Sequence, residues 1–138
     1  MNWTLEVVIV PVSDIDRAKA FYADQLGFNV DHDTAPAPGV RIVQLTPPGS
    51  GCSVVIGEGA VPHMPPGSVK GLQLVVPDIH KAHAFLTERG VEVTDVQVLG
   101  EDPDGRQALP PRPVAHANPG LDARGNRGGA GTGDLILC

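Results

Sequence analysis

The chain lacks the features that identify nucleic-acid binders, disulfide-stabilised domains and membrane proteins. Its net charge is −6 and its pI is near 5.2, which argues against the basic face of a nucleic-acid-binding protein. Its two cysteines, Cys52 and Cys138, are too few for a disulfide framework. No apolar run approaches the roughly 20 residues of a membrane span, and no secretory leader is recognisable. We therefore expect a cytoplasmic protein with no nucleic-acid or membrane partner.

Aromatic residues are scarce as well, and residues 100–138 contain none of the five. This segment holds eight glycines, five prolines and four arginines but no lysine. It can bury little apolar surface to offset the entropy cost of ordering it. We expect a largely irregular Gly/Pro-rich tail, in which Asp134 to Leu137 best fits a docked strand. Ala108–Leu109 and Val114–Ala115 are the other segments that could join a sheet.

Two origins of this tail stay open. Its content of Gly, Pro, Arg and Ala resembles GC-rich DNA translated in the wrong frame, which would make the C-terminus frameshifted or remodelled. The same composition also fits a natural flexible tail. Sequencing the coding DNA distinguishes them, because the first origin requires that a single-base shift restores two apolar strands.

What the chain does contain is an internal repeat. Residues 12–21 return 64 positions later as residues 76–85, and six of the ten residues are identical. Each copy follows an apolar run and leads to a glycine, Gly27 or Gly90, and then to a second apolar run. A repeat of this size indicates one supersecondary unit used twice, with a core and a site built between the two halves.

The residues around each copy predict one helix and several strands. Asp14 and Asp78 are suited to cap a helix, and the two glycines to end it. Residues 1–57 give the order βαβββ, with a loop at Ala35–Gly39 and strands at Leu5–Val10, Phe28–Asp31, Val40–Leu45 and Cys52–Ile56. A linker follows at 58–69. In residues 70–99 only βαβ is recognisable, with strands at Gly71–Val76 and Val91–Leu99 and a change of pattern near Asp95.

The first copy of the repeat, with Tyr22 and Leu26-Gly27-Phe28 after it, resembles the start of the vicinal oxygen chelate superfamily (glyoxalase, bleomycin resistance protein, extradiol dioxygenase). The resemblance covers about residues 5–99. It implies an α+β fold of two βαβββ modules that form a curled mixed sheet around a cavity, here with an incomplete second module. It also implies a homodimer whose cavities lie at or near the subunit interface.

In metal-using members of this superfamily, the resemblance places a histidine seven residues before the Asp that starts each helix. Those positions hold Val7 and Gly71 here. A Glu expected shortly after an Asp-Pro-Asp-Gly turn, present at 102–105, is replaced by Leu109. The fourth position falls in the strand 52–56, which has no carboxylate or histidine. Because a divalent metal needs such donors, we expect no catalytic metal and no cofactor.

The histidines offer only weak alternatives. His80 and His83 are three residues apart on the second helix, and their register predicts a solvent-facing pair without a third ligand. His32 lies between Asp31 and Asp33, which could chelate at a strand end but better fits an exposed loop cluster. His63 lies in the linker, which in the superfamily crosses near the cavity mouth. It is therefore a candidate pocket residue, with a solvated loop histidine as the alternative.

By the same resemblance, five residues would line the cavity: Val7, Ile9, Gly71, Gln73 and Val75. Gln73 is a neutral amide among apolar neighbours, which suits either a hydrogen bond to a substrate or a structural role. The sequence thus favours a metal-free protein that binds a small, partly apolar organic molecule. A metal-dependent lyase, isomerase or dioxygenase and an altered, inactive paralogue remain alternatives. No nucleophile with a partner is recognisable, so no catalytic residue is named and enzymatic activity stays open.

Overall fold

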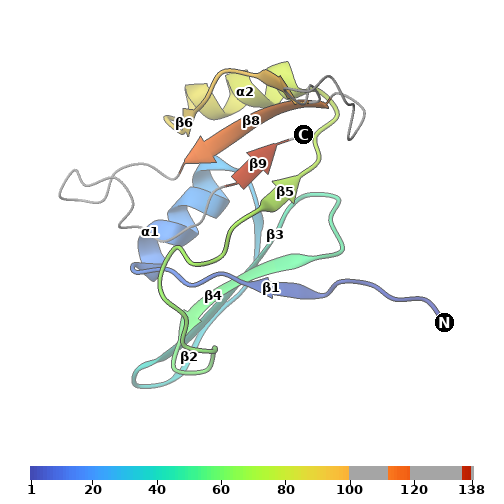
Figure 1. The fold of residues 1–138 in the computed structure, drawn as a ribbon. Helices are drawn as coiled ribbons and strands as arrows, with labels where there is room; N and C mark the ends of the chain where they lie inside the picture. Colours follow the sequence, from blue (N-terminus) through green and yellow to red (C-terminus); the bar gives the residue numbers. More distant parts are fainter. Residues whose placement is uncertain (100–111, 119–134, 138) are drawn as a thin grey trace. The chain divides into compact units, whose positions relative to one another are not determined.

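The computed structural model describes residues 1–99, 112–118 and 135–137, which fall into two compact units (Figure 1). The first unit contains Met1–Val69, and the second begins at Lys70. The remainder of the predicted tail, including Ala108–Leu109 and Asp134, lies outside the described residues. No described helix is long and apolar enough to cross a membrane.

The first unit has the predicted order βαβββ. Its elements are β1 (Val7–Ile9), α1 (Ile15–Ala20), the π-helical turn η1 (Phe21–Gln25), β2 (Asn29–Ala37), β3 (Val40–Thr46) and β4 (Ser53–Glu58). The strands form a curled, unclosed sheet in the order β1-β4-β3-β2. The β1–β4 pair is parallel and the other two pairs are antiparallel. The first sheet is therefore mixed, as the resemblance implied.

The helix of the first unit begins and ends where its local signals predicted. The Asp14 carboxylate accepts a hydrogen bond from the Arg17 backbone N–H at 3.1 Å, and Gly27 has a φ of 78°, which suits glycine at a helix end. The sequence did not predict the π-turn, in which the Leu26 N–H donates to the Phe21 carbonyl at 3.0 Å. Phe21 and Tyr22 are both buried in this turn.

The first core lies between α1, η1 and one face of the sheet. Val10, Val43, Leu45 and Ile56 are fully buried there. The Tyr22 ring lies 5.1 Å from the Phe21 ring and 5.5 Å from the Phe28 ring, centroid to centroid. Aromatic pairs at such distances add to the stabilisation from apolar burial.

The loop predicted at Ala35–Gly39 is wrong for its first three residues, because β2 continues to Ala37. Pairing with β3 extends the strand, with Thr34 opposite Ile42 and Ala37 opposite Val40. Proline is tolerated because β2 ends the sheet and the register shifts between Thr34 and Ala37, so the missing N–H of Pro36 interrupts no regular pairing. The turn itself contains Gly39, with a φ of 73°.

The second unit repeats the connectivity of the first, with two of its strands shorter than their counterparts. Its elements are β5 (Leu72–Leu74), α2 (Ile79–Glu88), β6 (Glu92–Val93), β7 (Gln97–Leu99), β8 (Arg112–Asn118) and β9 (Leu135–Leu137). The sheet order β5-β9-β8-β6 matches β1-β4-β3-β2, including the parallel first pair, while β7 pairs with β8 off this path. The candidates Val114–Ala115 and Leu135–Leu137 lie in β8 and β9, so the second module is reduced mainly in strand length.

The helix of this unit follows the same local rules as α1. Asp78 accepts from the backbone N–H groups of His80 and Lys81 at 3.0 and 3.1 Å, and Gly90 has a φ of 76°. The single strand predicted over Val91–Leu99 is wrong, because it is divided into β6 and β7. The two pieces pair with different parts of β8, which explains the change of pattern near Asp95.

Candidate functional site

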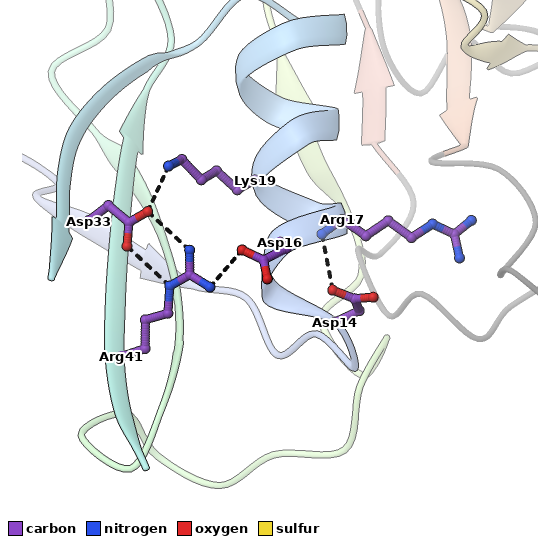
Figure 2. A network of polar contacts seen from close by, with 6 residues as sticks. All are labelled: Asp14, Asp16, Arg17, Lys19, Asp33 and Arg41. Atoms are coloured by element: carbon purple, nitrogen blue, oxygen red, sulfur yellow. Dashed lines mark hydrogen bonds and ion pairs between the residues drawn. The ribbon is translucent and has the colours of Figure 1, made fainter. Parts of the chain in front are cut away.

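The two faces of the first sheet differ in what covers them. Alternate residues of a strand point to opposite faces, and residues paired across strands share a face. Asp33, opposite Val43, and Arg41, two residues before Val43, share one face, and both bond to side chains of α1 (Figure 2). This is the helix-covered face. We call the face turned away from α1 the open face; β1, β3 and β4 bring Ile9, Gln44 and the buried Val55 to it.

A charge network fixes α1 to the β2–β3 hairpin on the helix-covered face. Arg41 donates to Asp33 from Nε at 3.1 Å and from Nη2 at 3.0 Å, and from Nη1 to Asp16 at 2.7 Å. Lys19 Nζ donates to the same Asp33 carboxylate at 2.6 Å. Hydrogen bonds from Arg41 and then Lys19 lower the pKa of Asp33 to about 2. Figure 2 shows these side chains converging on Asp33 from α1 and β3.

The open face carries a continuous row of polar side chains. Gln44 Nε2 donates to Ser53 Oγ at 3.2 Å, and the Ser53 and Thr46 hydroxyl oxygens lie 2.7 Å apart. Thr46 Oγ1 donates to the carboxylate of Asp31, which also accepts from Asn29. These bonds, first from Thr46 and then from Asn29, lower the pKa of Asp31. We call Asp31, Thr46, Ser53 and Gln44 the polar row.

Two of the predicted cavity residues lie beside this row. Val7 pairs with Ser53 and Ile9 with Val55 across β1 and β4. Val7 is 39% exposed, whereas Ser53 is only 6% exposed. A buried hydroxyl of the polar row therefore lies next to accessible apolar surface. The structure thus brings Val7 and Ile9 together with polar groups on one face of one sheet.

The other predicted cavity residues are spread over both units. Gly71 immediately precedes β5 and has a φ of 80°, a conformation that L side chains rarely adopt. Gln73 lies in β5 opposite Ile136, and Val75, just after β5, is 82% exposed. His63 is exposed in the connection between β4 and β5. Their role in a cavity stays a prediction.

The histidines of both candidate clusters lie in regular secondary structure, so the loop predicted at His32 is wrong. His32 lies within β2, and its neighbours Asp31 and Asp33 hydrogen-bond to different partners, Thr46 and Arg41. On α2, His80 is exposed and His83 is half-buried. Within the part of the chain that the structure describes, no group of three or more His, Cys, Asp or Glu residues could hold a metal ion.

Sequence reasoning missed Gln44, Thr46 and Ser53 as site residues, and it considered Asp31 only as a possible chelating neighbour of His32. Gln44 and Thr46 are two positions apart in β3 and alternate with Val43 and Leu45, which lie on the buried face. That alternation was visible in the sequence. The row itself was not, because it depends on the register between β3, β4 and β2.

Comparisons with known proteins agree with this architecture. The model of the Glyoxalase/Bleomycin resistance protein/Dioxygenase superfamily matches residues 4–107. The solved structure of TnmS3, an antibiotic binding protein from Streptomyces sp. CB03234, is 29% identical with a TM-score of 0.69, covering 99% of this chain and 94% of that chain.

Two further solved structures are similar over nearly their whole length. A glyoxalase/bleomycin resistance protein from the same Streptomyces strain is 28% identical, with a TM-score of 0.67 and coverage of 97% of this chain and 98% of that chain. A superfamily member from Sphaerobacter thermophilus DSM 20745 is 26% identical, with a TM-score of 0.67 and coverage of 99% and 97%. Among curated proteins, no sequence matches this chain at a significant level.

Proposed function

Since the chain belongs to the glyoxalase/bleomycin resistance protein/dioxygenase superfamily, we propose that it binds a small, partly apolar organic molecule without a metal ion. The observation that carries the proposal is the open face of the first sheet, where Val7 and Ile9 adjoin the polar row. Apolar walls with a few placed polar groups are typical of small-molecule sites. The similarity to TnmS3, an antibiotic binding protein, supports an antibiotic or a compound of similar size as the ligand.

The residues at the superfamily's metal positions do not fit a divalent ion. Val7 offers only methyl groups, and its strand partner is the hydroxyl residue Ser53. Gly71 offers no side chain, and its positive φ disfavours any other residue. Binding and sequestration therefore suit these residues better than metal-dependent lyase, isomerase or dioxygenase chemistry.

The test is a ligand screen by thermal shift, with bleomycin and a panel of polycyclic aromatic antibiotics, each run with and without EDTA. A compound that binds only the native state raises the apparent stability. We expect a stabilising compound whose effect survives EDTA. Stoichiometric metal in the purified protein together with an EDTA-sensitive shift would favour the enzyme alternative, and no stabilisation by any compound would favour an inactive paralogue.

A matched pair of variants locates the binding surface. Val7 on the open face and Val30 on the helix-covered face are 39% and 36% exposed, so both tolerate a polar side chain to a similar degree. V7E should weaken binding at least tenfold, because a carboxylate replaces an apolar contact, whereas V30E should leave it unchanged. Equal effects of the two variants would contradict a site on the open face.

We further propose that the protein is a homodimer that acts in the cytoplasm. Met1, Trp3 and Leu5 are all exposed in the segment that leads into β1, and they offer apolar surface suited to a second copy. Light scattering should give twice the chain mass, and the double variant W3S/L5S should give a monomer. Fractionation of cells expressing a tagged chain checks the location.

A further inference from the structure

We infer that Gln44 determines ligand specificity by presenting its side-chain carbonyl oxygen, Oε1, to a hydrogen-bond donor on the ligand. The ligand class would then be an apolar body that carries an O–H or N–H group. This inference rests on the proposed function, because it assigns a chemical preference to the same open face. Asp31 is a positioning residue in it, since it acts on Gln44 through Thr46 and Ser53 and also by a direct side-chain hydrogen bond.

The carboxylate of Asp31, at one end of the polar row, determines which group donates and which accepts in each hydrogen bond of the row. An ionised carboxylate can only accept hydrogen bonds, and Asp31 accepts from both Thr46 and Asn29. The Thr46 hydroxyl has one proton, and that proton is given to Asp31. The Ser53 hydroxyl must therefore donate to Thr46, 2.7 Å away.

The same count of hydroxyl protons determines whether the nitrogen or the oxygen of the Gln44 amide faces Ser53. Because the single Ser53 proton is given to Thr46, Ser53 Oγ can only accept from Gln44. It does so from Nε2 at 3.2 Å. The carbonyl oxygen is at the other end of the planar amide, and no described residue donates to it.

The surroundings of Gln44 make its carbonyl oxygen selective. Gln44 is half-buried, with the buried Val55 as its partner on β4 and His32 as its partner on β2. A ligand covering this face removes water from Oε1. A ligand donor replaces the lost hydrogen bond, whereas a ligand acceptor leaves Oε1 unpaired, which costs free energy.

The experiment compares two probes of nearly equal shape, 2-naphthol, which can donate a hydrogen bond, and 2-methoxynaphthalene, which can only accept. Their dissociation constants are measured by calorimetry for the full chain and for the variants Q44L, D31N and D33N. We expect the unmodified chain to prefer 2-naphthol about fivefold, the ratio for one net hydrogen bond. Q44L should bind both probes equally.

The variant D31N gives the sharper result. The side-chain amide that it introduces can donate to Thr46, which allows the whole row to reverse and Gln44 to present Nε2. The preference for 2-naphthol should then fall although Gln44 is retained, because the Asn side chain can both accept and donate and the row can run in either direction. D33N makes the same substitution on the helix-covered face and should keep the fivefold preference.

The outcomes separate this inference from the proposed function. Equal binding of both probes by the unmodified chain, or a full preference in D31N or Q44L, would overturn the role of Gln44 and leave small-molecule binding intact. If the unmodified chain binds neither probe and no compound in the thermal-shift screen, the proposed function fails and the inference fails with it.

Discussion

Phe21 and Phe85 occupy the same position in the two copies of the repeat, yet Phe21 is 2% exposed and Phe85 is 39% exposed. Phe21 packs against Tyr22 in the first core. Phe85 lies under the guanidinium of Arg89, with 3.4 Å between Cζ and the ring centroid. The same residue of the repeat is therefore a core residue in the first unit and a partly exposed one in the second.

This difference in burial predicts that replacing the two phenylalanines by alanine lowers the free energy of unfolding by different amounts. F21A should lower the free energy of unfolding by about 3–5 kcal/mol, as expected for removing a buried aromatic ring. F85A should cost about 1 kcal/mol, because the ring is partly solvated and loses mainly its contact with Arg89. Urea denaturation of both variants checks this, and equal costs would contradict the difference in packing.

A second prediction concerns acid stability. The folded-state pKa of Asp33 is lowered to about 2, below the value of about 3.9 in an unfolded chain. A lowered carboxyl pKa gives stability that is present above the unfolded pKa and is lost as the pH falls through the folded pKa. The stability lost in D33N should therefore be full at pH 7, decrease from about pH 4 and vanish near pH 2.

Denaturation of the unmodified chain and of D33N across this pH range measures the effect. D24N is a suitable control, because it makes the same substitution at an exposed position. A difference between D33N and the unmodified chain that persists unchanged below pH 2 would show that Asp33 stabilises the fold by packing, not by charge.

Features that depend on adjacent residues could be predicted from the sequence, whereas features that depend on pairing with distant strands could not. The caps at Asp14 and Asp78 and the left-handed Gly27 and Gly90 depend on a few adjacent residues, so they were correctly identified. The extension of β2 to Ala37 and most of β8 were missed, because pairing with distant strands overrode their proline content. Alternation correctly gave Val7 and Ile9 a common face, but only the strand register reveals that Ser53 and Gln44 share it.

A third prediction follows from the cap of α2. Asp78 accepts two backbone hydrogen bonds, from His80 and Lys81, whereas Asp14 accepts one, from Arg17. D78A leaves two N–H groups without their side-chain acceptor and should lower the free energy of unfolding by about 1–2 kcal/mol. D14A leaves one such group and should lower it by about 1 kcal/mol. Thermal denaturation checks both variants, and D78N, which keeps a side-chain oxygen, should retain most of the stability.

The last prediction concerns the close approach of β3 and β4. A Cβ at Gly57 would overlap the Arg41 carbonyl oxygen and lie 3.3 Å from Ile42 Cα. Both contacts are backbone atoms of the paired strand, so G57A must push the strands apart and should cost about 1–3 kcal/mol. G51A is the matched control, since nothing lies within 4 Å of its new methyl group.

The position of Gly57 also connects this prediction to the charge network. Arg41 pairs with Glu58 and Ile42 with Gly57, so a displaced β3 end would move the Arg41 guanidinium away from Asp16 and Asp33. G57A should therefore also reduce the acid sensitivity that depends on Asp33, and G51A should not. Unfolding curves at pH 7 and pH 2 measure this, and G57A with unmodified stability at both would contradict the tight packing of β3 against β4.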